Sequence, residues 1–222
     1  MNGADDWGNP GPDFTYGFGI FNARNTVETI EQNRYVLNSV STGNTINFNI
    51  NGVPAGTHQI KVLLYWPDAP ASPNAPTALV NNLNLVATDP GSVDHLPLIL
   101  DPSIPNLNNP AVPGVDNLNN IEQVVIDNPP AGNFTVKVTG ANVPSRTQNY
   151  VVVYQVINPG VTIEHPRGSE IFVPGEIEAI RFNAYGGGNN TFTAEYSTNG
   201  GGTWTVINNN IPATSRNIFW AV

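Results

Sequence analysis

The 222-residue chain contains no cysteine, and only 8 of its residues are Lys or Arg. The lack of Cys excludes a disulfide framework, a thiolate metal site and a cysteine nucleophile. The formal net charge is −9 although only 11% of residues are charged, so the acidity comes from a shortage of cations. Nucleic acids and anionic membranes attract clustered Lys and Arg, so neither is an expected partner. No apolar run approaches the ~20 residues of a membrane-spanning helix, and no membrane span is expected.

What the chain does have is Asn, Thr, Gly and Pro in abundance, with 21 Gly and 20 Pro. Low charge combined with this composition is typical of extracellular bacterial β proteins. We therefore expect a secreted or cell-surface bacterial protein.

Alternation of apolar and polar residues indicates strands in the middle of the chain. Turn sequences such as Val53-Pro-Ala-Gly56 and Asn128-Pro-Pro-Ala-Gly132 separate the alternating segments. Short strands with no helix between them pair in antiparallel fashion, which predicts an all-β jelly-roll barrel or sandwich. The expected strands lie at residues 46–50, 60–66, 79–86, 124–126, 134–138 and 150–154.

A similarity between two segments of the chain supports this prediction. The segment Pro54–Val62 matches Pro130–Val138 at its Pro, Ala, Gly, Lys and Val positions. Each copy is a turn followed by a strand, and the jelly roll is built from two similar Greek keys. We expect the lysine of each copy, Lys61 or Lys137, on the polar side of its strand.

The N-terminal stretch has a different pattern. Glycines flank Phe18, and an Asn-Ala pair then opens a predicted helix at about residues 22–32. The segment Tyr16-Gly-Phe-Gly-Ile-Phe-Asn-Ala23 resembles the end of the catalytic domain in subtilisin-like serine proteases. The D-[ST]-G, H-G-T and G-T-S-[MA] segments that carry catalysis in that family do not occur in the chain. The resemblance implies that residues 1–37 are the tail of an absent catalytic domain. Its apolar residues should then be poorly ordered, or buried against the barrel or another chain: Phe14, Tyr16, Phe18, Ile20 and Phe21.

A second resemblance covers about residues 38–157. The segments Ile60–Pro70, Leu79–Leu85, Asn117–Glu122 and Pro130–Val138 follow one another as in the C-terminal β-barrel of alkaline subtilisin-like proteases. That barrel is similar in topology to the P domain of proprotein convertases. The resemblance implies a jelly-roll domain over 38–157, although Asn82 and Asn84 stand where the family often has Asp.

A Pro/Gly junction near Ile157-Asn-Pro-Gly160 precedes a third segment, expected as a separate domain over 158–222. Its Glu195-Tyr-Ser-Thr-Asn-Gly-Gly-Gly-Thr-Trp204 resembles the immunoglobulin-like modules of secreted bacterial enzymes. The resemblance implies a small β-sandwich with Trp204 in its core.

Oxygen-bearing side chains from three segments flank the barrel strands and suggest a calcium site, because Ca²⁺ accepts carboxylate, amide and backbone oxygens. The resemblance points the same way. The other interpretation is that Asn and Asp occupy these loops because they satisfy turn backbones. The candidate ligands are Asp68, Asn82, Asn84, Asp116, Asn117 and Glu122.

Other candidate sites are weaker. The three histidines, His58, His95 and His165, lack a carboxylate partner or second His at ligand spacing, so we expect structural or surface roles. Tyr65, Trp66, Trp204 and Trp220 could stack on sugar rings, but we expect them to serve packing.

These features predict no catalysis by this chain itself. The resemblance implies the non-catalytic C-terminal region of a secreted subtilisin-like serine endopeptidase, which stabilises the catalytic domain in cis and aids binding of protein substrate. The alternative is an adhesion module that binds carbohydrate or a cell surface.

Overall fold

A computed structural model describes residues 1–186 and 191–222 of the chain. They divide into two units, Met1–Val156 and Ile157–Val222. The division lies one residue from the domain boundary expected after residue 157, and residues 1–37 belong to the first unit. The chain is mostly β, with 47% of residues in strands and 6% helical, which confirms the all-β class.

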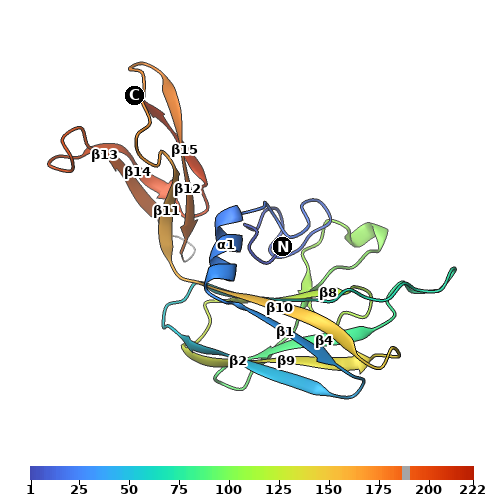
Figure 1. Cartoon of the computed structure of the whole chain (residues 1–222). Coiled ribbons are helices and arrows are strands. Elements are labelled where there is room, and N and C mark those ends of the chain that lie inside the picture. The colour runs from blue at the N-terminus through green and yellow to red at the C-terminus, as the bar shows by residue number, and fades with distance from the viewer. Residues whose placement is uncertain (187–190) are drawn as a thin grey trace. The chain divides into compact units, whose positions relative to one another are not determined.

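Two four-stranded antiparallel sheets build the first unit, in the orders β1-β10-β3-β8 and β2-β9-β4-β5. This is the jelly-roll order, in which successive strands alternate between two facing sheets except β4 and β5, which are neighbours in one sheet. Figure 1 shows the sheets as two layers, with α1 on the outer side of the layer that contains β1 and β10. The elements are α1 (Ala23–Glu31), β1 (Tyr35–Val40), β2 (Thr45–Val53), β3 (Gln59–Tyr65), β4 (Asn82–Thr88), β5 (Asp94–His95), β6 (Leu98–Ile99), η1 (Ile104–Asn106), β7 (Val112–Pro113), β8 (Ile121–Asp127), β9 (Gly132–Asn142) and β10 (Gln148–Ile157).

The core between the two sheets comes from the predicted alternation. Ile60, Val62 and Leu64 on β3 are fully buried, as are Val136 and Val138 on β9. Trp66 follows β3 and is also fully buried, with its indole Nε1 donating to the carbonyl of Asn81 at 2.9 Å. Its expected packing role is confirmed.

The predicted helix is present as α1. Asn22 caps its N-terminus by accepting a hydrogen bond from the backbone N–H of Asn25 at 3.1 Å. Thr29 is buried on the face of α1 that meets the barrel, where its hydroxyl lies 3.5 Å from the side-chain nitrogen of Gln155 on β10. Among the described residues, no helix is long and apolar enough to cross a membrane.

Residues 1–22, which we call the N-terminal strap, lie on the outer face of the sheet that contains β3 and β8. Asn2 is buried there and donates to the carbonyls of Lys61 and Val153. Gly19 has a positive φ of 99°, and a Cβ at this position would lie 2.1 Å from the carbonyl oxygen of Asp5. Glycine at this position therefore permits the close approach of the two backbone segments.

The strap corrects two expectations. Lys61 is not on a wet face, because the strap covers it and its ammonium donates to the carbonyl of Ala4 at 3.0 Å. The strap side chains Phe14, Tyr16, Ile20 and Phe21 are exposed and Phe18 is half-buried, so the barrel does not bury them, and their burial against another chain stays a prediction. They project from a segment that is held by its polar groups.

The second unit is a smaller β structure of two antiparallel sheets, β11-β12-β15 and β13-β14. Its core is formed by Phe182, Ala184 and Ile211. The strands are β11 (Gly160–His165), β12 (Ile177–Tyr185), β13 (Thr191–Tyr196), β14 (Thr205–Pro212) and β15 (Asn217–Ala221).

Candidate functional site

The candidate site of the first unit centres on Glu122, a carboxyl group between the two sheets. Glu122 is the second residue of β8 and is only 2% exposed. Its Oε2 accepts a hydrogen bond from the backbone N–H of Leu85 on β4 at 2.6 Å. Leu85 lies opposite Val138 of β9 on one side, and on the other side β5 pairs with β4 only at Ala87 and Thr88, so no strand lies opposite Leu85 there. The carboxyl group thus takes the place of a strand partner at the edge of β4.

The surroundings of Glu122 disfavour the ionised form of its carboxyl group. Burial raises the pKa of this carboxyl to about 8, against an ordinary value of 4.5. The Leu85 N–H opposes that rise, and the nearby charge of Asp116 adds to it. At neutral pH the group therefore holds a proton unless a cation is close enough to stabilise the carboxylate.

Three buried side-chain oxygens in this region lack a hydrogen-bond partner among the described residues: Oε1 of Glu122, Oδ1 of Asn82 and Oδ1 of Asn84. The two asparagines are two residues apart on β4 and share one face of the strand. Buried polar atoms are nearly always paired, so three unpaired oxygens around one stretch of β4 require an explanation.

The loop before β8 contributes the next residues. Asn117 accepts a hydrogen bond from the side-chain nitrogen of Asn82 at 2.8 Å, which leaves the Asn82 oxygen free. Asp116 is buried and accepts hydrogen bonds from the backbone N–H groups of Leu118 and Asn119. Asp116 therefore shapes the loop and adds negative charge near Glu122.

Asp68 is placed differently from the other candidates. Its carboxylate accepts three backbone hydrogen bonds, from Ala69, Val80 and Asn81, at 2.6 to 2.9 Å. These bonds close the long loop between β3 and β4, as the turn-forming interpretation predicts. Asp68 therefore has the loop-closing role. Contacts link the other candidates in part: Asn82 bonds to Asn117, and Glu122 bonds to the backbone of Leu85, the residue after Asn84. Asp116 lies close enough to Glu122 to raise the pKa of its carboxyl.

The donor set suits a hard cation. Carboxylate and amide oxygens are the usual ligands of Ca²⁺, which tolerates irregular geometry. Residues 1–186 and 191–222 contain no group of three or more His, Cys, Asp or Glu side chains placed to hold a metal. Two of the three unpaired oxygens belong to asparagine, so this region is not an acidic cluster.

Two histidines do have carboxylate partners, contrary to the expectation from spacing. Nε2 of His95 lies 3.3 Å from Asp89, and Nδ1 of His165 lies 3.9 Å from Glu170. Each pair spans five or six residues and is brought together by a turn. Both pairs are local, which fits the structural or surface roles expected of these histidines.

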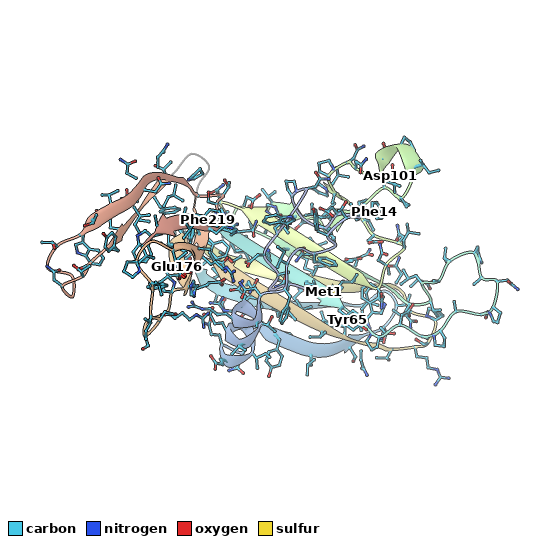
Figure 2. The ribbon with its side chains drawn as sticks, turned by 90° about the horizontal axis from the view of Figure 1, so that it is seen from above. Met1, Phe14, Tyr65, Asp101, Glu176 and Phe219 are labelled. Carbon is cyan, nitrogen blue, oxygen red and sulfur yellow. The ribbon has the colours of Figure 1, made fainter. Side chains whose placement is uncertain are left out.

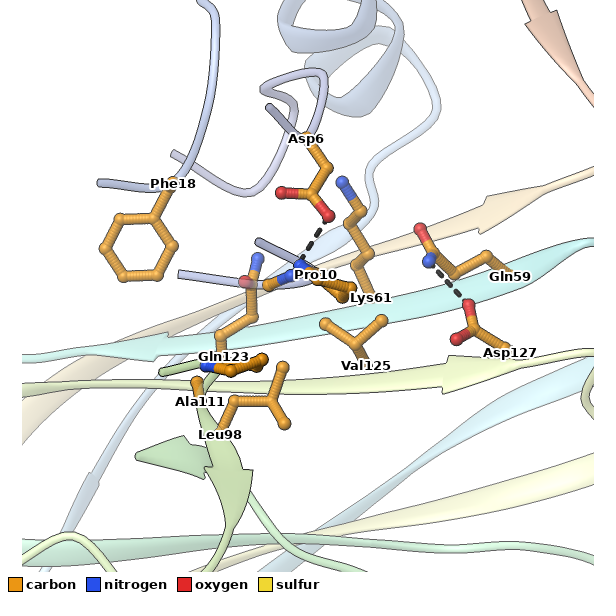
Figure 3. A pocket seen from close by; sticks show the side chains of 12 residues that line it. Asp6, Pro10, Phe18, Gln59, Lys61, Leu98, Ala111, Gln123, Val125 and Asp127 are labelled. Carbon is orange, nitrogen blue, oxygen red and sulfur yellow. Dashed lines mark hydrogen bonds between the residues drawn. The ribbon is translucent and has the colours of Figure 1, made fainter. Parts of the chain in front are cut away.

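Two hollows lie on the outer face of the first sheet. A cavity of about 160 Å³ under the strap is lined by Lys61, Gln123 and Asp6, among others (Figure 3). Burial lowers the pKa of the Lys61 amine. A larger apolar groove of about 500 Å³ lies beside α1, with Met1 and Tyr65 in its lining (Figure 2).

The aromatic residues of the second unit differ from expectation at one position. Trp220 is half-buried and packs against Tyr196 with ring centroids 5.1 Å apart, so its packing role is confirmed. Trp204 is 59% exposed, and the expectation of a core position is wrong. It lies in the lining of a 340 Å³ cavity between the two small sheets.

Comparison with known proteins adds no family: no family model matches the chain, and no curated protein is similar to it.

Proposed function

We propose that the first unit is a non-catalytic jelly-roll domain stabilised by a calcium ion, and that the chain serves a secreted subtilisin-like serine endopeptidase as its C-terminal accessory region. The proposed ligands are Glu122, Asn82 and Asn84, with Asp116 adding charge from nearby. The observation that carries the calcium site is the group of three buried, unpartnered oxygens.

The charge of the donor set bears on affinity. One carboxylate and two neutral amides supply less negative charge than the acidic loops of intracellular calcium sensors. Sites with few charged ligands bind in the range of about 10⁻⁴ to 10⁻³ M, which suits an extracellular module. The proposal therefore includes a weak site that fills at extracellular calcium concentrations.

A competing explanation needs no metal. Protonated Glu122 could donate its O–H to one of the amide oxygens, which would satisfy two of the three atoms at once. The two explanations differ in their response to calcium, because only an ion-binding site gains stability from the ion.

The experiment is thermal unfolding of the full chain with chelator and with millimolar calcium at pH 7.5. At 100-fold excess over the dissociation constant, a bound ion adds about 2.7 kcal/mol of stability. Glu122→Gln keeps an oxygen for the Leu85 N–H but removes the charge, so it should lose the calcium response while remaining folded. Glu31→Gln is the matched control, since it makes the same change at an exposed position. Equal melting temperatures of the natural protein in chelator and in millimolar calcium would refute the calcium site.

The accessory role is supported by two features. The motifs of catalysis are missing from the sequence, and the strap exposes an aromatic surface suited to contact with another domain. Two observations test it. The chain alone should not cleave casein or peptide substrates, and the gene should encode catalytic Asp, His and Ser motifs upstream. Cleavage by the purified chain, or an upstream region without those motifs, would refute the assignment.

A second candidate function is favoured by the exposure of Trp204. An exposed indole next to a cavity is a common platform for sugar rings, and this unit could serve adhesion to carbohydrate or a cell surface. Binding on a glycan array should then vanish in Trp204→Ala or in Tyr65→Ala, according to which aromatic is used. Phe219→Ala is the control, because Phe219 is exposed in the same unit but outside the cavity lining. A blank array would count against this candidate.

A further inference from the structure

The chain contains three Asn-Gly pairs: Asn2-Gly3, Asn51-Gly52 and Asn199-Gly200. In such a pair the backbone nitrogen of glycine can attack the side-chain carbonyl of asparagine, because glycine has no Cβ to obstruct the approach. The attack requires that the asparagine side chain and the glycine nitrogen be free to move together. The structure treats the three pairs very differently in this respect.

Two of the asparagine side chains are held. Asn2 is buried, and its Oδ1 accepts a hydrogen bond from Gln123 at 3.1 Å while its Nδ2 donates to two backbone carbonyls. Asn199 is exposed, but its Oδ1 accepts hydrogen bonds from the backbone N–H of Thr203 and from the Ser197 hydroxyl, and its Nδ2 donates to the Thr203 hydroxyl, all at 2.9 Å. Either side chain must break these bonds before its carbonyl carbon can react.

Asn51 is exposed, and its side chain makes no hydrogen bond within the described part of the chain. It lies at a β-bulge, where pairing of β2 with β9 moves from Ile50 opposite Phe134 to Val53 opposite Gly132. Residues 51 and 52 therefore have no partners in the register. Gly52 has a φ of 68°, with no other atoms within 4 Å of where a Cβ would stand. Its N–H is held by one side chain, the Oδ1 of Asn133, at 2.9 Å.

We propose that Asn51 is a site of spontaneous deamidation. The Gly52 nitrogen loses its proton and bonds to Cγ of Asn51, the Cγ–Nδ2 bond breaks, and ammonia leaves with that proton. Water then opens the resulting succinimide at either carbonyl. The products are aspartate, or isoaspartate with the backbone running through the former side chain. Each event makes the chain one charge more negative, at an exposed bulge in the jelly roll.

The expected difference between sites follows from the hydrogen bonds. Each hydrogen bond contributes about 1 kcal/mol. Reaction at Asn199 breaks three side-chain bonds, whereas reaction at Asn51 breaks only the bond between the Gly52 N–H and Asn133. The difference is about 2 kcal/mol, so Asn199 should react about 30-fold more slowly than Asn51. Asn2 has comparable bonds and is buried as well, so it should be at least as slow as Asn199.

The experiment is incubation of the full chain at pH 8 and 37 °C, followed by digestion and mass spectrometry of the three Asn-Gly peptides. The isoaspartyl product is identified by its separate elution. A parallel sample in denaturant is the control: there the three sites should react at similar rates, because the folded contacts are gone. Asn51→Gln should remove the signal from its peptide and leave the other two unchanged. Deamidation of Asn199 or Asn2 as fast as that of Asn51 in the folded protein would overturn the proposal.

Discussion

Calcium removal should make the stability of this protein depend on pH through Glu122. A group whose pKa is higher in the folded state stabilises the fold at low pH, and that contribution is lost as pH rises through the folded-state pKa. The Glu122 pKa of about 8, against 4.5 in the unfolded chain, sets the window. Without calcium, stability should fall steadily between about pH 4.5 and pH 8 and then level off.

The size of the effect can be worked out at pH 7, which lies about 2.5 pH units above the unfolded-state value. Each unit corresponds to about 1.4 kcal/mol, so folding loses about 3 kcal/mol relative to acidic pH. For a protein of this length that corresponds to a decrease in Tm of about 10 °C. Carboxyl groups whose pKa is lowered by hydrogen bonds, such as Asp13 and Asp101, titrate below this window.

The assay is a series of thermal or denaturant unfolding curves between pH 5 and pH 8 in chelator, for the natural chain and for Glu122→Gln. The glutamine cannot ionise, so its curve should be flat by comparison, and contributions from all other groups cancel in the difference. Saturating calcium should flatten the curve of the natural chain as well. Equal slopes for the two proteins in chelator would refute the reasoning about Glu122.

Two further predictions concern packing. Gly19→Ala should lower the free energy of unfolding by about 1–3 kcal/mol, because the residue has positive φ and the new Cβ would meet the carbonyl of Asp5. Gly17→Ala introduces the same backbone strain into open space, so it should lower the free energy of unfolding less, as measured by urea unfolding. Trp66→Phe should lower the free energy of unfolding by about 2–4 kcal/mol, since it leaves the carbonyl of Asn81 without its donor and opens a void in the core. Denaturant unfolding at pH 7 measures this change, and a change below about 0.5 kcal/mol would contradict the prediction.

The strands of the jelly roll could be predicted because their side chains alternate. Ile60, Val62 and Leu64 face the core, and the sequence indicated that face correctly. Lys61 could not be placed the same way. Alternation assigns Lys61 to the face opposite the core. Whether solvent reaches that face depends on the N-terminal strap, about 60 residues earlier in the chain, and the sequence of the strand carries no information about the strap.

The candidate site was predicted in part for a similar reason. Residue type and loop position suggested Asn82, Asn84 and Glu122, yet only the fold shows that Glu122 bonds to the Leu85 N–H on the facing sheet. Asp68 has the same chemistry, but three backbone donors occupy it. Trp204 was assigned to a core from the resemblance to immunoglobulin-like modules, yet it is exposed in this fold.

The pairing of β1 with β10 has a mechanical consequence. The chain enters the jelly roll at Tyr35, which lies opposite Val153, and the backbone N–H of Tyr154 donates to the carbonyl of Arg34 at 3.0 Å. Entry and exit of the barrel are therefore side by side at one end of an antiparallel pair. Tension applied across Arg34 and Tyr154 would break the ladder one bond at a time, like a zipper, instead of shearing all its bonds together. The barrel should yield at low force when pulled from these two points, and it should hold much better when pulled from opposite ends of β10.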